Sequence, residues 1–384
     1  MEENKFKFIC DQNCHEFEQI LWRLCHDKDW YIKLNAQENI NYNTYYCIDQ
    51  RTLSQEKNLL NNDLLSLLKN NEKFFIMIYS AHESIDDKNF KFIKKYTLEN
   101  NINQNKIYLV NNCANLKELQ IKNSTNFNLH KLNVLTTTKI YDMMSSKNGF
   151  FRKNKEGKFF MTFNKEDKRH RYALLIFLKK NNLLDFTNWS YLPTNKRKIS
   201  KQTFSPIMNE KDIEMYLNEI EYFNNLSYKY SDYEINYDNK LDQIIETTML
   251  ENFDNYENSY INLTTESVFD EREDVVHITE KSFKPFYYYQ FPLILSSENH
   301  IKKMKELYDF DFFDDIINHD YDNIVDDIER FEKYTKEVLR IYQNKDLFIE
   351  FYNKNQDRFE KNKEKVKKIM KMNDNDYNYF LNLI

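Results

Sequence analysis

Continuous apolar runs alternate with helical spacing along the first half of the chain. The run 74–79 (FFIMIY) is typical of a parallel strand that is buried on both faces. Further strands are predicted at 6–9, 106–110 and 132–135, and helices at 59–68 and around 91–96. Strands that alternate with helices in this way favour a parallel sheet, so we predict an α/β lobe here.

The second half repeats this alternation. Strands are predicted at 159–163, 259–265 and 293–295, with helices from 169 through 178 and from 280 to about 290. Helical spacing also predicts helices at 210–224, 298–307 and 323–342, and 310–313 is a short predicted strand. This half is therefore predicted to form a second α/β lobe.

The chain is long enough, at 384 residues, for two domains of ordinary size. The basic segment KNGFFRKNKEGK contains both glycines of the chain and is the best candidate linker. We predict two Rossmann-like lobes and a tail: an N-terminal α/β lobe at 1–146, a linker at 147–158, a C-terminal α/β lobe at 159–344 and a charged helical tail at 345–384.

The scarcity of glycine excludes several classes of protein. With only two glycines, no Walker A loop and no G-x-G-x-x-G fingerprint can exist. A phosphate group must therefore be held by side chains and helix N-termini. The net charge of −6 gives no general attraction to nucleic acid, although a local basic patch is compatible with it.

Composition also bears on where the protein works. There is no apolar run long enough to cross a membrane, and the N-terminus MEENKFKF lacks the apolar core of a signal peptide. The five cysteines, an odd number, fit free thiols in a reducing compartment. We expect a cytoplasmic protein with no membrane span.

Charged residues gather where the strand 259–265 ends and the helix at 280 begins. Glu266 follows the strand, and Thr279 is a good N-cap for a helix whose first turn holds Glu280. Lys281 and Lys284 share one helix face because they are three residues apart. In open α/β sheets ligands bind at this edge, where an ammonium pair suits a diphosphate and a carboxylate suits sugar hydroxyls. An ordinary strand–helix–strand unit with a solvated charged cap would show the same pattern.

A second cationic group stands at the start of the helix at 169. Arg169, His170 and Arg171 follow the strand 159–163 and Lys165. Cations at a helix N-terminus oppose the helix dipole, and a bound anion would resolve that conflict. A solvated basic helix start is the alternative interpretation.

The strand 74–79 is followed by His82 and Glu83. Polar side chains at the ends of parallel strands form an edge suited to an acceptor, and either residue could deprotonate an acceptor hydroxyl. A capped polar loop without chemistry is the interpretation that the pattern favours for each residue. Asp309 and Asp311 form an Asp-x-Asp pair, but such pairs are frequent by chance in an acidic chain, so no metal site is predicted.

Three pieces of the second half resemble a family of glycosyltransferases found in tailed phages and large DNA viruses. They are Thr264-Thr265-Glu266, 277–285 (HITEKSFKP) and 290–294 (QFPLI), where the family pattern is a Thr-Glu pair, an acidic loop, TEKTFKP and a proline-containing strand. The basic helix start and the following NLLD at 182–185 are also similar, and the match extends over about half the chain. The sequence departs from the pattern at Lys165, at Ser282 and in the aromatic run 286–289.

This resemblance implies a GT-B-like fold with a metal-independent transferase activity. A Thr-Glu-Lys element is similar to the donor-binding part of fucosyltransferases and exostosin-like enzymes, where it contacts the nucleotide-sugar. It implies that a UDP- or GDP-linked sugar is the donor, that no cofactor is needed, and that the acceptor is a glycan or a hydroxymethylated DNA base. Without the resemblance, the residues indicate only an α/β protein that binds an anion. A non-catalytic binding protein with the same fold is therefore the alternative.

Overall fold

The structure, a computed structural model, describes residues 6–10, 43–49, 60–80, 85–111, 113–131, 151–152, 154–164, 168–191, 199–226, 229–230, 233–234, 253–269 and 275–371. These residues fall into two compact units. The first unit contains residues 6–131, 275–277 and 369–371 of that set, and the second contains 151–269 and 278–368. The expectation of an α/β protein built from parallel sheets is confirmed.

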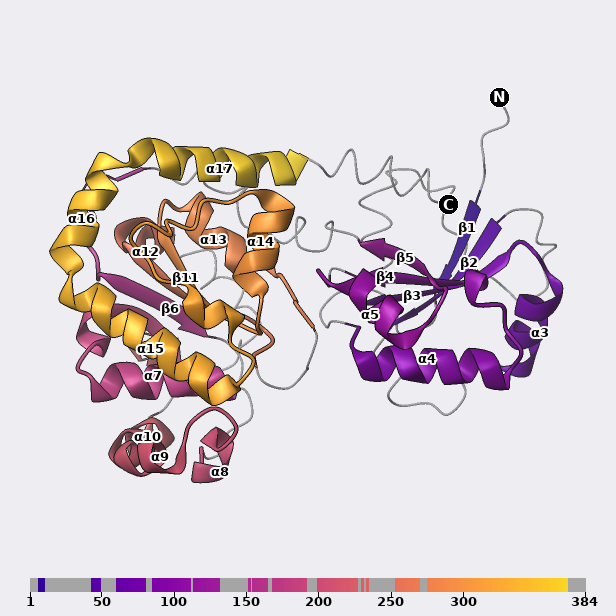
Figure 1. Cartoon of the computed structure of the whole chain (residues 1–384), viewed down its shortest axis with the longest axis horizontal. Helices are drawn as coiled ribbons and strands as arrows, with labels where there is room; N and C mark the ends of the chain where they lie inside the picture. Colours follow the sequence, from indigo (N-terminus) through magenta and orange to yellow (C-terminus); the bar gives the residue numbers. More distant parts are fainter. Residues whose placement is uncertain are drawn as a thin grey trace. The chain divides into compact units, whose positions relative to one another are not determined.

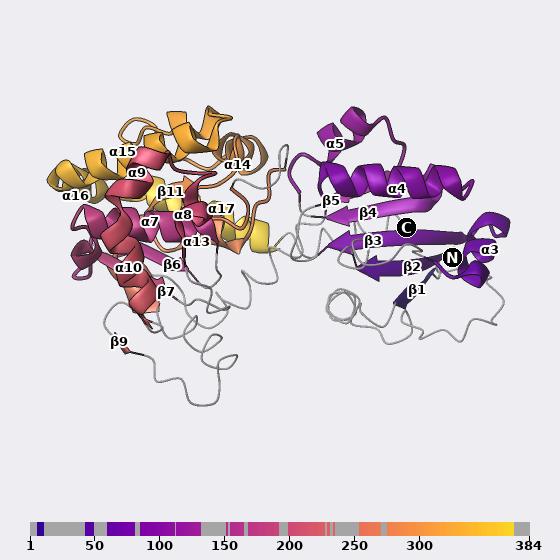
Figure 2. The same cartoon turned by 90° about the horizontal axis from the view of Figure 1, so that it is seen from below.

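The sheet of the first unit has five parallel strands in the same order as the chain (Figure 2). They are β1 (Phe6–Cys10), β2 (Asn43–Asp49), β3 (Phe74–Ser80), β4 (Ile107–Asn111) and β5 (Asn128–Lys131). The connecting helices are α3 (Asn62–Asn70), α4 (Asp87–Glu99) and α5 (Leu116–Asn123), with a 3₁₀ turn η2 (Gln104–Lys106). Ile76 and Leu109 of the sheet pack with Leu68, Phe90 and Leu119 of these helices in one buried cluster. Burial of these apolar side chains is what holds the helices on the sheet.

The sheet of the second unit is built around four parallel strands. They are β6 (Phe160–Asn164), β7 (Thr187–Tyr191), β10 (Ile261–Thr265) and β11 (Phe291–Leu295), in the order β11-β10-β6-β7. Two short antiparallel strands, β8 (Lys229–Tyr230) and β9 (Tyr233–Glu234), continue the sheet beyond β7. The helix α7 (Arg169–Lys180) lies on one side of this sheet and α13 (Glu280–Tyr287) on the other (Figure 1).

The strand order of the second unit reverses direction at β6. The chain moves from β6 to β7 on one side, and later to β10 on the other side of β6. Such a topological switch point separates the loops that follow the two strands and leaves room for a ligand beyond their carboxyl ends. The candidate site is therefore expected at the ends of β6 and β10.

The remaining helices surround the second sheet. The C-terminal ones wrap around it (Figure 1) and are α14 (His300–Tyr308), α15 (Asp327–Gln343), α16 (Lys345–Lys354) and α17 (Gln356–Lys371). The others are α8 (Lys201–Phe204), α9 (Glu210–Met215), α10 (Leu217–Asn225) and α12 (Phe253–Asn258), with 3₁₀ turns η3 (Leu184–Phe186) and η4 (Asp320–Asn323). Arg358 of α17 binds both Asp311 and Asp315, and so fastens α17 to the loop after α14.

Two predicted elements are wrong. The stretch 310–313 is not a strand, because Asp309 and Phe313 have positive φ and the aromatic side chains between them fill the core beside α13. The predicted helix 210–224 is two helices, α9 and α10, with a break at Tyr216, which leaves the helical region at φ −101° and ψ 9°. The predicted strand 132–135 lies outside the described residues.

The described part of the predicted linker and most of the described part of the predicted tail belong to the second unit. In the segment 147–158, Arg152 binds the side chain of Glu257 and Lys155 binds its carbonyl oxygen, so the described part of this segment belongs to the second unit. The helices α16 and most of α17 also belong to that unit and not to a separate tail. The sequence pattern could not indicate these contacts, because the partners are about a hundred residues apart.

Candidate functional site

The carboxyl ends of β6 and β10 are joined by polar side chains. Thr265, the last residue of β10, donates from Oγ1 to Oδ1 of Asn164, the last residue of β6, at 2.5 Å. Asn164 also donates from Nδ2 to Oγ1 of Thr162 at 3.3 Å. Both strand ends are buried, so this edge of the sheet is rigid at the switch point.

Glu266, the residue after β10, is completely buried and organises the edge. Its Oε1 accepts from the backbone N of Thr279 at 3.2 Å and from Oγ of Ser282 at 2.5 Å. Its Oε2 accepts from Oγ1 of Thr279 at 2.8 Å and from the backbone N of Ser267 at 3.1 Å. The carboxylate therefore holds the start of α13, as an anion at a helix N-terminus should.

The side chains at the start of α7 contact the turn that Glu266 and Ser267 form after β10. His170 Nε2 lies 2.8 Å from the carbonyl oxygen of Glu266, which can only accept, so Nε2 carries the proton. Arg171 Nη2 donates to the same carbonyl at 3.4 Å, and Lys168 Nζ donates to the carbonyl of Ser267 at 2.9 Å. The beginning of α7 is thus attached to the turn after β10 by three positively charged or imidazole side chains.

The helix α13 begins at Glu280 with Thr279 as its N-cap, which confirms the predicted start. Thr279 Oγ1 accepts from the backbone N of Lys281, and Lys281 Nζ lies 3.0 Å from Oε1 of Glu280. The side chains of Lys281 and Glu280 are 27% and 13% exposed. Lys284 is buried one turn later, where its Nζ lies 3.3 Å from the hydroxyl of Tyr256 and over that ring.

Burial and charge set the protonation of this cluster in opposite directions. Burial alone would raise the pKa of Glu266, but the attraction of Lys281 and the hydrogen bond from Ser282 outweigh it, so the pKa lies below its ordinary value. Burial lowers the pKa of His170 well below its ordinary value, and the neighbouring Arg171 lowers it further. Burial also opposes the charge of Lys284, yet Tyr256 and Glu280 keep its pKa raised. At neutral pH the edge holds an ionised Glu266, a neutral His170 and a charged Lys284.

These positions divide the predicted site residues into two groups. Glu266, Thr279, His170 and Arg171 are brought together, and their side chains are buried among their partners. Arg169, Glu280 and Lys281 lie at the same edge and are partly exposed, and so is Lys168, which was not among the predicted residues. The first group can shape the edge, whereas the second can also reach a ligand. A direct contact of Glu266 with ligand hydroxyls stays a prediction, as does the contact of His170 and Arg171 with phosphate.

Other predicted residues lie elsewhere or outside the described part of the chain. His82, Glu83 and Lys165 are outside the described residues. Asp309 pairs with Lys365 at 2.9 Å, and Asp311 forms two hydrogen bonds with Arg358. The Asp-x-Asp pair is therefore engaged with α17. Across the described ranges, no group of three or more His, Cys, Asp or Glu residues is arranged to hold a metal ion.

Sequence reasoning missed His300, the first residue of α14. It is buried, and its two ring nitrogens lie 2.9 Å from Oγ of Ser282 and 3.0 Å from Oγ of Ser296. Through Ser282 it joins the cluster around Glu266. A histidine at the start of the helix that follows a buried strand was the only signal, and it does not indicate which residue the ring contacts.

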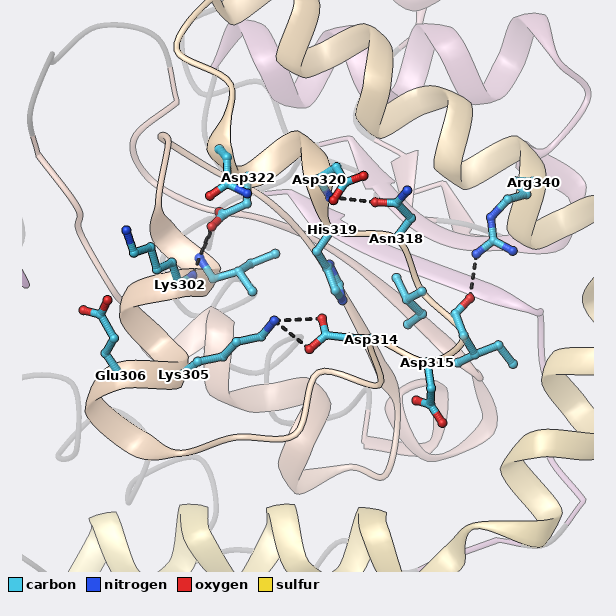
Figure 3. A pocket seen from close by; sticks show the side chains of 14 residues that line it. Lys302, Lys305, Glu306, Asp314, Asp315, Asn318, His319, Asp320, Asp322 and Arg340 are labelled. Atoms are coloured by element: carbon cyan, nitrogen blue, oxygen red, sulfur yellow. Dashed lines mark hydrogen bonds and ion pairs between the residues drawn. The ribbon is translucent and has the colours of Figure 1, made fainter.

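A groove of about 800 Å³ lies elsewhere in the second unit, between α14, α15 and the loop that joins them (Figure 3). Its charged side chains mostly bind one another or nearby groups. Lys305 Nζ lies 2.7 Å from Oδ1 of Asp314, Arg340 Nη2 donates to the carbonyl of Ile316, and Asp322 caps α14 by accepting from two backbone N–H groups. The groove therefore offers mixed charges that are largely paired with one another.

No family model, no curated protein and no solved structure matches this chain. The described helices include none with the length and apolar character needed to cross a membrane.

Proposed function

We propose that the protein is a GT-B-like glycosyltransferase whose second unit binds a nucleoside-diphosphate sugar at the carboxyl ends of β6 and β10. One observation carries the proposal: the cationic start of α7 and the start of α13, where Lys281 is partly exposed, are both attached to Glu266, the first through its carbonyl oxygen and the second through its carboxylate. Two helix N-termini with exposed cations at a switch point favour a ligand with two phosphate groups.

The proposed chemistry follows from the charges at this edge. When a sugar leaves its nucleotide, negative charge develops on the diphosphate. Lys168, Arg169 and Lys281 are partly exposed cations, and they can stabilise that charge by hydrogen bonds and attraction. Because the chain has only two glycines, side chains and helix N-termini must do what a glycine-rich loop does elsewhere.

The remaining assignments follow the resemblance of the sequence. Glu280 is partly exposed beside Lys281 and is proposed to accept hydrogen bonds from ribose or sugar hydroxyls. The acceptor, a glycan or a hydroxymethylated DNA base, is assigned to the first unit, with Glu83 or His82 as the base that takes its proton. A protein that binds the nucleotide-sugar without transferring the sugar is the alternative.

Thermal unfolding with UDP, GDP, UDP-glucose, UDP-arabinose and GDP-mannose tests the proposal. Ligand at ~100 times its dissociation constant adds about 2.7 kcal/mol to stability, so a true donor raises the melting temperature visibly. We expect a selective shift for one base, and its loss in Lys281→Ala. The matched control Lys305→Ala removes a cation from the groove on α14 and should keep the shift.

Either of two results would contradict the proposal. The absence of a shift with every nucleotide would remove the donor site, and equal shifts in wild type and Lys281→Ala would place it elsewhere. If the nucleotide-sugar binds but releases no UDP or GDP, even slowly and whether or not an acceptor is present, the non-catalytic alternative is favoured.

A further inference from the structure

His300 is a buried residue to which the proposed function gives no role. It is completely buried at the start of α14, and it contacts Ser282 in the first turn of α13 and Ser296 just after β11. A buried histidine that joins the starts of two helices costs free energy unless both ring nitrogens have partners. Here both do.

The direction of the hydrogen bonds follows from their acceptors. Ser282 has one hydroxyl proton, and the ionised Oε1 of Glu266, 2.5 Å away, can only accept it. The Nε2 of His300, 2.9 Å from the same hydroxyl oxygen, must therefore donate its own proton to Ser282. The chain of donation runs from His300 through Ser282 to Glu266, and Glu266 in turn holds the backbone N and the hydroxyl of Thr279.

The groups around His300 favour a neutral ring, whose proton is then on Nε2. Burial lowers its pKa, and the nearby carboxylates of Glu266, at the end of β10, and Asp322, in η4, offset that effect only in part. A neutral ring leaves Nδ1 to accept the single hydroxyl proton of Ser296, 3.0 Å away; the carbonyl of Val268, 3.2 Å from that hydroxyl, then keeps the backbone N–H of Ser297 as its donor. Both serines thus have defined partners.

We propose that His300 is a positioning residue of the donor site, which through Ser282 and Glu266 holds the first turn of α13 in the form that presents Lys281. This inference rests on the proposed function, because the turn matters for function only if it binds the donor. His300 itself touches no ligand in this account. Its effect reaches Lys281 through Thr279, whose hydroxyl accepts from the Lys281 backbone N.

Two substitutions of the same residue separate this role from simple packing. In His300→Gln the amide nitrogen falls near the position of Nε2 and keeps the donation to Ser282. In His300→Asn the amide oxygen can fall near Nδ1 and accept from Ser296, while no donor reaches Ser282. The proposal requires that glutamine preserves the turn and that asparagine does not, although both shorten and reshape the side chain.

Hydrogen exchange of the peptide that spans 278–284 is the first readout, because it needs no ligand. We expect exchange in His300→Asn to be about tenfold faster than in wild type, as for one lost hydrogen bond, and in His300→Gln to be near wild type. Ser282→Ala should match His300→Asn, and the double variant should add little, since both break one chain of contacts. The dissociation constants of UDP and GDP should follow the same order.

His319 supplies the matched control. It is a buried histidine of the same unit whose Nε2 donates to the carbonyl of Phe312, and none of the contacts described for its ring reaches α13. His319→Asn should leave exchange at 278–284 unchanged. Equal exchange in His300→Asn and His300→Gln, or an effect of His319→Asn as large as that of His300→Asn, would overturn the proposal.

The two readouts also separate this inference from the proposed function. If wild type binds neither UDP nor GDP, the donor site is wrong and His300 loses its functional role, even where the exchange pattern holds. If wild type binds and the asparagine variant binds as tightly, only the positioning role is wrong. Tighter binding in wild type and His300→Gln than in His300→Asn supports both.

Discussion

The described strand ends of the two units carry different polar groups. In the first unit the strands follow the order of the chain, and the residues at the end of β4 and just after it include the buried amides of Asn111 and Asn115. In the second unit the order reverses at β6, and the residues buried beyond the strand ends include the carboxylate of Glu266 and the guanidinium of Arg171.

Neutral amides are sufficient to hold a turn. Asn111 Oδ1 accepts from the backbone N of Cys113 at 2.7 Å, and Asn115 Oδ1 accepts from that of Val276 at 3.0 Å. Buried charges cost far more to desolvate, so a fold gains little by using them for the same purpose. The difference supports the view that the second edge has been shaped for an anionic ligand and the first turn only for structure.

The largest predicted effect is that of Glu266→Ala. Removing a buried carboxylate that accepts four hydrogen bonds leaves their donors unsatisfied, so the free energy of unfolding of the second unit should fall by about 3–5 kcal/mol. Asn111→Ala removes a neutral acceptor in the first unit and should cost about 1–3 kcal/mol. Urea denaturation followed by hydrogen exchange measures each unit separately, and equal losses would erase the contrast between the two edges.

Acid should affect the second unit before the first. Burial lowers the pKa of His170 and His300 in the folded state, so the unfolded chain takes up protons first as the pH falls below the ordinary histidine value of about 6.5. The free energy of unfolding therefore decreases as the pH falls from about 6.5 toward the lower pKa that the two histidines have in the folded state. Hydrogen exchange across 168–178 and 278–304 should show a loss of protection that begins as the pH falls below about 6.5. A flat profile there would contradict the assigned protonation states.

A smaller effect is expected for Arg358→Ala. Arg358 binds Asp311 and Asp315 and lies over the ring of Phe313, but it is partly exposed, and exposed ion pairs are screened. We expect a loss of about 1 kcal/mol, measured by urea denaturation, with nucleotide binding unchanged. A loss of nucleotide binding would mean that the charges on α17 belong to the donor site. That result would contradict a donor site at the ends of β6 and β10.

The smallest effect on stability is expected for Lys281→Ala. The side chain is 27% exposed, and its contacts with Glu280 and Thr279 lie at the edge of the unit. Its attraction to the buried carboxylate of Glu266 is also lost, so the free energy of unfolding should fall by about 0.5 kcal/mol, within the range of exposed ion pairs. Circular dichroism during thermal unfolding checks this, and a large loss would show that Lys281 serves the fold and not a ligand.

The sequence predicted what depends on local pattern. The apolar run 74–79 became β3, and Thr279 caps α13 as its residue type and position indicated. The adjacency of Glu266 and Thr279 followed from the rule that strand ends and helix starts share an edge. The C-terminal strand 310–313 failed because short aromatic runs also suit buried loops.

Contacts between distant residues lay beyond sequence reasoning. Nothing in the spacing places His300 against Ser282, eighteen residues earlier, or Arg358 against Asp311. The predicted roles of His170 and Arg171 were drawn from charge alone, yet both side chains contact the carbonyl of Glu266 because α7 docks there. Charge identifies the region of a site, while packing decides which side chains can meet a ligand.

Calorimetric titration of UDP and of GDP into wild type, Lys281→Ala and Lys305→Ala tests the central claim most directly. The account predicts that one of the two nucleotides binds wild type and Lys305→Ala with similar affinity, and that Lys281→Ala binds it at least tenfold more weakly, as expected for a lost charge-assisted contact. Failure of both nucleotides to bind wild type, or equal affinity in all three proteins, would contradict a donor site at the switch point of the second unit.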